Sequence, residues 1–194
     1  MDTESPGFSN RIVEAVHRAA TSRSIIKLLV TPFGLIAFFL VLKYSVLLFL
    51  WMDTFFGLPR VLRSPLNTLA SAPFLAFGSL LILWSLFCFV RARGTPLPIT
   101  PPSRLIVTGP YAHSRNPMLG GLIIFIFGLG VLLGSLCLTF VFTTLFTALM
   151  TAMVKRIEEP ELEKRFGEHY VRYRSSVPRF LPRMSLRRRT PKTF

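Results

Sequence analysis

The sequence predicts an all-α polytopic membrane protein with about four transmembrane helices, the last two paired as a C-terminal hairpin, plus a cytoplasmic C-terminal helix. Three observations predict this fold. The 194 residues are 51% hydrophobic and only 16% charged, whereas soluble domains carry about a quarter charged residues. The apolar residues are gathered in blocks. The last block, residues 118–154, contains 37 consecutive uncharged residues.

The first two blocks each predict one membrane span. The first span is expected at residues 28–52, with Trp51 as an anchor at the membrane interface, and the second at residues 72–90. A loop at residues 53–71 is expected between them. The polar residues before the first span carry an amphipathic stripe that favours a short interfacial helix.

The uncharged block is too long for one span. A straight helix of that length would be about 55 Å long, against a hydrocarbon core of about 30 Å. It should therefore fold as a helical hairpin that breaks near the glycine-containing residues 128–135. Gly130 and Gly134 also suit close helix packing.

The distribution of basic residues orients the spans. Lys and Arg number four in residues 1–27, four in 91–117 and twelve in 155–194, but two in 53–71. Four spans place both termini on one side, and this excess predicts that the side is cytoplasmic. The formal net charge of +14 thus fits attraction to a membrane surface, and its distribution argues against nucleic-acid binding.

The cysteines predict neither a disulfide nor a metal site. Cys88 and Cys137 lie in separate apolar blocks, near opposite membrane faces in this topology. We therefore expect two small buried side chains, and the chain contains no Cys/His spacing typical of metal ligation.

A hairpin also brings two polar segments together. Arg115, Asn116 and Pro117 stand just before it, and the acid pair Glu158–Glu159 stands just after it, so both should meet at one membrane face. The acid pair has two readings: solvated interface charges, or carboxylates that accept hydrogen bonds from the hydroxyls or ammonium group of a ligand.

The chain after the acid pair has its own predicted structure. The fourth span should end near the acid pair, and Pro160 should begin a new helix that continues to about Tyr173. Residues 177–183, VPRFLPR, predict an extended segment that folds back over Arg115, Asn116 and Pro117, which we call the Arg-Asn-Pro corner.

Three features in this order resemble one family: PPSRLIVTGPY with RNPM, the uncharged hairpin, and EEPELEKRFGEHYVRYRSSVPRFLPR. Together, over residues 91–183, they resemble the membrane-embedded methyltransferases that include isoprenylcysteine carboxyl methyltransferases and phospholipid methyltransferases. The resemblance implies S-adenosylmethionine as cofactor and a lipophilic methyl acceptor, either an isoprenylcysteine-like carboxylate or a lipid amine. The Arg-Asn-Pro-Met form is similar to a bacterial variant, which implies a bacterial cytoplasmic membrane.

The resemblance also assigns residues by their place in the motifs. Catalytic roles fall to Arg115 and Glu159. The implied cofactor-binding residues are Gly109, Tyr111, Asn116, Pro117, Met118, Gly120, Glu158 and Glu159. Asn116 replaces the family's common histidine, and Ser176 stands where an arginine often precedes Val-Pro in the isoprenylcysteine enzymes. Arg174 and Arg179 are therefore candidates for binding the acceptor.

The expected organisation has four parts. They are the N-terminal segment 1–27, the first two spans 28–90, the methyltransferase core 91–183 and a basic tail 184–194. Two alternatives stay open: a non-catalytic lipid-binding membrane protein, and an NADPH-dependent enzyme of the sterol-reductase type, for which the chain is short. The sequence leaves the oligomeric state open.

Overall fold

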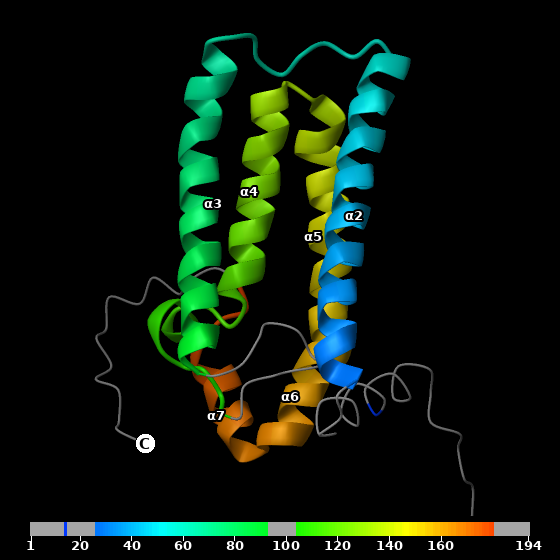
Figure 1. The fold of residues 1–194 in the computed structure, drawn as a ribbon. Coiled ribbons are helices and arrows are strands. Elements are labelled where there is room, and N and C mark those ends of the chain that lie inside the picture. The colour runs from blue at the N-terminus through cyan, green and yellow to red at the C-terminus, as the bar shows by residue number, and fades with distance from the viewer. Residues whose placement is uncertain (1–13, 15–25, 93–103, 181–194) are drawn as a thin grey trace, which may run out of the picture.

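The computed structural model describes Glu14, residues 26–92 and residues 104–180. Within these residues the protein is a bundle of helices that run side by side (Figure 1). The bundle contains α2 (Ile26–Phe55), α3 (Leu66–Arg91), α4 (Pro117–Leu133) and a continuous helical stretch, Cys137–Phe166, that includes α5 (Thr143–Met153). All but the shorter α4 are long and apolar enough to cross a membrane. The all-α polytopic fold is therefore confirmed. The tail 184–194, nearly all of 1–25 and residues 93–103 lie outside the described residues.

The first two spans are confirmed, but the loop between them is shorter than predicted. Helix α2 continues to Phe55 and α3 begins at Leu66. Pro65 directly precedes α3, and the fixed φ of proline suits the start of a helix. The first turn of α3 is also tied to α4, because Asn67 Nδ2 donates a hydrogen bond to the Leu132 carbonyl at 2.7 Å.

The uncharged block does fold as a hairpin, and its turn lies at the end of the predicted region. Gly134 ends α4 in the left-handed region at φ +69°, where a side chain would be strained. Two side chains then cap the returning helix. The Ser135 hydroxyl accepts the Leu138 N–H at 2.9 Å, and Asp53 Oδ1 in α2 accepts the Cys137 N–H at 2.9 Å.

The two arms of the hairpin differ in length. The 17 residues of α4 span about 25 Å and the 30 residues of the returning stretch about 45 Å. The prediction that the helix of the fourth span ends near the acid pair is wrong. The helix passes through the π-helical turn η3 (Val154–Glu158) directly into α6 (Glu159–Phe166). A wider π turn leaves room for the ring of Pro160, which would crowd the carbonyl four residues earlier in a regular helix.

The predicted helix from Pro160 to Tyr173 is in fact two helices. Gly167 ends α6 with φ +56° and ψ −133°, and α7 (Glu168–Ser176) starts immediately after it. A residue with this φ cannot continue a right-handed helix, so the chain turns sharply. The turn brings Tyr170 and Tyr173 back against the bundle, where both are buried.

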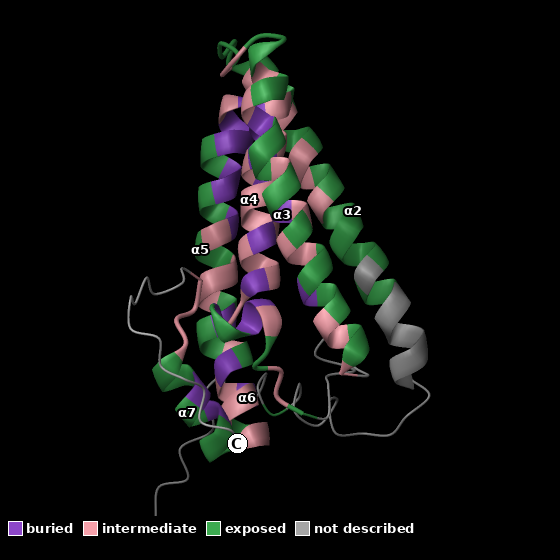
Figure 2. Cartoon of the chain, turned by 90° about the vertical axis from the view of Figure 1, so that its left-hand side faces the viewer, coloured by how far each residue is buried: buried purple, intermediate pink, exposed green. Residues whose placement is uncertain are grey.

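Small residues hold α3, α4 and the returning helix close together. A Cβ on Gly78 of α3 would lie 2.7 Å from the carbonyl oxygen of Gly121 in α4. A Cβ on Gly130 would lie 2.5 Å from Thr139 Oγ1 in the π-helical turn η2 (Cys137–Phe142). Close packing at Gly130 is thus confirmed, as membrane helices favour. Buried residues gather on these inner faces, whereas α2 is largely exposed (Figure 2).

Candidate functional site

The hairpin places the Arg-Asn-Pro corner and the acid pair at the same end of the bundle, as predicted. This end also carries the 3₁₀ turn η1 (Gly109–Ala112), α6 and α7 (Figure 1). Arg115 Nη1 lies 2.6 Å from Glu159 Oε1, and both side chains are largely buried. The two halves of the predicted site are therefore in direct contact.

Glu159 is bound by a second arginine. Arg179 reaches it with two donors, Nε to Oε1 at 2.9 Å and Nη2 to Oε2 at 2.8 Å. The carboxylate thus accepts three charge-assisted hydrogen bonds, and the residue is only 5% exposed. Removing one partner of a buried ion pair leaves an uncompensated charge and lowers the stability of the fold. Glu159 therefore has the surroundings of a residue that stabilises the structure.

The same arginine belongs to a segment that lies across the corner. We call residues 177–180 the C-terminal strap. Its Pro178 carbonyl accepts the Arg115 N–H at 2.8 Å, and its Arg179 carbonyl accepts the Asn116 N–H at 3.1 Å and the Ser114 hydroxyl at 2.9 Å. The predicted fold-back is confirmed for these residues, and 181–183 lie outside the described chain.

Buried phenols form the wall between the corner and α7. The Tyr173 hydroxyl donates to the Tyr111 carbonyl at 2.7 Å and so joins α7 to η1. Burial raises the pKa of all three phenols, that of Tyr170 to about 12 and those of Tyr111 and Tyr173 also above their ordinary value. All three phenols are therefore neutral near pH 7.

The first member of the acid pair has different surroundings. Glu158 is exposed, and its carboxylate makes no hydrogen bond or salt bridge within the described part of the chain. Burial is the main cause of the raised pKa of Tyr111, and the charge of Glu158 adds to it. Of the two adjacent carboxylates, only that of Glu158 is free to accept hydrogen bonds from a ligand.

The corner leaves further groups open. Asn116 is the N-cap residue of α4, but its side chain makes no capping hydrogen bond and is half-buried. One turn later, a Cβ on Gly120 would meet no atom within 4 Å, so there is open space beside it. Pro117 is the buried first residue of α4, and Met118 next to it is half-buried. Gly109 begins η1 at φ +62°.

One other candidate lies apart from this cluster. Arg174 is exposed and bonds Glu163 at 2.7 Å, so the structure does not bring it to Glu159. The two described histidines, His113 at the end of η1 and His169 in α7, are both exposed. The pairing of Arg179 with Glu159 was not anticipated, because sequence spacing does not tell which carboxylate a strap arginine reaches.

Comparison with known proteins assigns the chain to a family. The family described as phospholipid methyltransferase matches residues 66–169, which is more than half of the chain and includes α3, the corner, the hairpin and the acid pair. No curated protein matches it. The chain therefore belongs to the phospholipid methyltransferase family and is a multi-pass membrane methyltransferase that uses S-adenosylmethionine to methylate a lipid.

Proposed function

We propose that the protein methylates the amine of a phospholipid head group, at a site formed by Glu158, the corner and η1, on the cytoplasmic face of the membrane. The observation that carries this proposal is the division of the acid pair. Glu159 is saturated by two arginines, while Glu158 beside it is exposed and without a hydrogen bond in the described residues.

The chemistry of the open groups fits S-adenosylmethionine. This cofactor carries an ammonium group and a ribose diol, which need acceptors, and an adenine ring, which needs an amide and a flat apolar contact. Glu158 supplies an acceptor, Asn116 an amide, and the open side of Gly120 supplies room. We assign the cofactor site to these residues together with Gly109, Tyr111, Pro117 and Met118. When bound, the cofactor supplies an activated methyl group.

Arg115 and Glu159 have a positioning role in this proposal. Their ion pair joins the start of α4 to the start of α6, and Arg179 ties the strap to both. Methyl transfer depends on alignment of the acceptor atom with the donor and on exclusion of water. A rigid cluster at the junction of α4, α6 and the strap supports both requirements.

The arginines favour an amine over a carboxylate acceptor. Arg115 and Arg179 are both occupied by Glu159, and Arg174 by Glu163 in an exposed pair. None of the three is left to bind the carboxylate of an isoprenylcysteine. The match to the phospholipid methyltransferase family supports the same choice. The acceptor lipid enters laterally from the bilayer, with its amine near Glu158.

Product chemistry tests this proposal. The protein is reconstituted in lipid vesicles that contain phosphatidylethanolamine, and methyl-labelled S-adenosylmethionine is added. We expect label that stays non-volatile after mild base, since an N-methyl group remains on the head group whereas a methyl ester is released as methanol. Base-labile label would identify a carboxylate acceptor and overturn the amine assignment. Cofactor affinity is measured in detergent for Glu158→Gln and Asn116→Ala; unchanged affinity in both variants would refute the cofactor site.

A further inference from the structure

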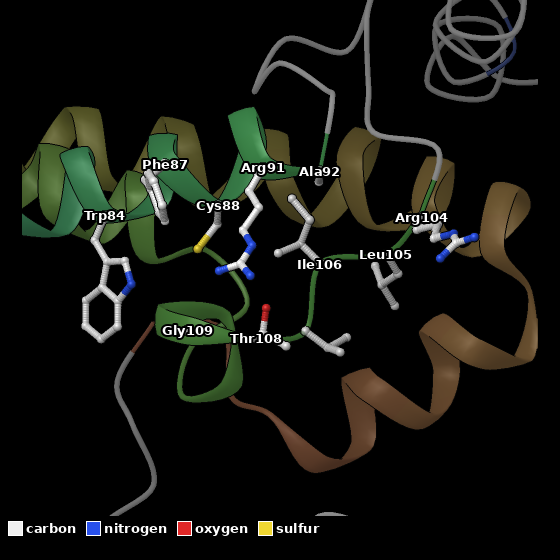
Figure 3. A pocket seen from close by; sticks show the side chains of 11 residues that line it. Trp84, Phe87, Cys88, Arg91, Ala92, Arg104, Leu105, Ile106, Thr108 and Gly109 are labelled. Carbon is white, nitrogen blue, oxygen red and sulfur yellow. The ribbon is translucent and has the colours of Figure 1, made fainter. Parts of the chain in front are cut away.

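A pocket lies on the flank of α3, outside the ion-pair cluster around Glu159. It is formed between the last two turns of α3 and residues 104–109, and its volume is about 570 Å³ (Figure 3). Trp84, Phe87, Cys88 and Arg91 line it from α3. The buried α4-facing residues of α3, such as Gly78 and Ser85, are not among the lining residues. The pocket therefore opens on a different side of α3 from the helix bundle.

The pocket is strongly basic. Arg91 is the last residue of α3, and Arg104 begins the segment opposite. Both are exposed, and neither makes a hydrogen bond or salt bridge within the described residues. Figure 3 shows the Arg91 side chain directed toward Thr108, which adds a hydroxyl to the lining. Among the described residues that line the pocket none is a carboxylate, so this part of the chain gives its two arginines no counter-charge.

The pocket also has an apolar side that faces the bilayer. Trp84 is 47% and Phe87 61% exposed, although both belong to a helix that is apolar enough to span the membrane. Arg91 ends this helix, so its guanidinium lies where the hydrocarbon core gives way to head groups. One end of the pocket is apolar, and the other has two arginines without an ion-pair partner among the residues that the structure describes. This combination matches an amphiphile with an anionic head.

We propose that this pocket binds an anionic glycerophospholipid, with its head group at the end lined by Arg91 and Arg104 and an acyl chain along Trp84 and Phe87. The lipid comes from the leaflet on the side of α6 and α7. It differs from the amine-bearing methyl acceptor in net charge, because a zwitterionic head group has an ammonium that offsets its phosphodiester and so gains less from two arginines than an anionic head group does. The pocket shares Gly109 with the site assigned to the methyl donor, but its test measures lipid contact and does not use cofactor binding.

Trp84 is a reporter inside the pocket. The chain has two tryptophans, so Trp51→Phe leaves Trp84 as the only one. The variant is placed in nanodiscs that contain a small fraction of brominated phosphatidylglycerol or, separately, brominated phosphatidylcholine. Bromine quenches tryptophan on contact. We expect the anionic lipid to quench Trp84 at roughly tenfold lower mole fraction than the zwitterionic one at low ionic strength.

Three comparisons decide the outcome. Arg91→Gln with Arg104→Gln should abolish the preference for the anionic lipid, while the matched pair Arg60→Gln with Arg63→Gln, in the loop at the other end of the bundle, should preserve it. Trp84→Phe, which reports from Trp51 instead, should show no preference. This third comparison remains informative even if the arginine variants fail to fold. Equal quenching of Trp84 by both lipids overturns the proposal, as does a preference that survives the Arg91 and Arg104 changes. Relief of quenching by soluble glycerol phosphate would show a free-phosphate site and overturn the lipid assignment.

Discussion

Arg179 in the C-terminal strap donates two hydrogen bonds, of 2.9 and 2.8 Å, to the carboxylate of Glu159 at the start of α6. Arg115 approaches the same carboxylate at 2.6 Å. One buried charge thus fixes the relative positions of the hairpin's second arm, the start of α4 and the C-terminal strap. This arrangement makes stability and cofactor binding separable, because the anchor and the open acceptor are adjacent but distinct residues.

The first prediction concerns the strap. Arg179→Ala removes two hydrogen bonds to the Glu159 carboxylate. We expect it to lower the free energy of unfolding by about 1–3 kcal/mol, because a buried charged group then has too few hydrogen-bond partners. Thermal denaturation in detergent measures the effect. Arg174→Ala is the matched control, because it removes an exposed pair with Glu163 and should cost less than about 1 kcal/mol. Equal losses for both variants would contradict a special role for Arg179.

The second prediction separates the two acids. Glu159→Gln leaves Arg115 and Arg179 facing each other without a counter-charge, so we expect a destabilisation of about 3–5 kcal/mol. Glu158→Gln should leave the melting temperature nearly unchanged but weaken binding of S-adenosylmethionine by roughly tenfold, the loss of one charged hydrogen bond. Melting curves and calorimetric titration of the same preparations measure both quantities. If Glu158→Gln unfolds the protein and Glu159→Gln does not, the division of roles is reversed.

Much of this arrangement could be predicted from the sequence because it follows from length and charge. The uncharged residues 118–154 are too long for one span, so they had to double back, and the contact of Arg115 with Glu159 follows from that return. Membership of a methyltransferase family then decides against the lipid-binding and reductase alternatives.

What the sequence could not predict depends on local backbone geometry. Glu158 and Glu159 are the same residue type side by side, and only the direction in which the helix turns them decides which one meets the arginines. The break at Gly167 was missed for a related reason. A single glycine is compatible with a continuous helix, and the apolar residues Leu162, Phe166 and Tyr170, four positions apart, fit a helix that continues past Gly167.

The third prediction uses two neighbouring glycines. A Cβ on Gly121 would lie 2.9 Å from the Gly78 carbonyl oxygen and 2.9 Å from the Leu81 Cβ, so Gly121→Ala should separate α3 from α4 and cost about 1–3 kcal/mol. Gly120→Leu projects into open space. It should leave the melting temperature within a few degrees of the wild type while reducing cofactor affinity at least several-fold. Normal cofactor affinity in a folded Gly120→Leu variant would show that the space beside Gly120 is not part of the site.

The last prediction concerns pH and follows from an amine acceptor. An alkyl ammonium has a pKa near 10 and carries no lone pair until it loses its proton, so the reactive fraction grows about tenfold per pH unit below that value. Raising the pH from 8 to 9 should therefore increase kcat/KM for lipid methylation; this range lies above the pKa of Glu158, which desolvation raises to about 7. A carboxylate acceptor, ionised above a pKa of about 4, would give a flat profile over this range. The tyrosines add no titration between pH 7 and 9, because burial raises the pKa of Tyr170 to about 12 and raises those of Tyr111 and Tyr173 as well. Initial rates with labelled donor at several pH values, at saturating cofactor, distinguish the two acceptor chemistries.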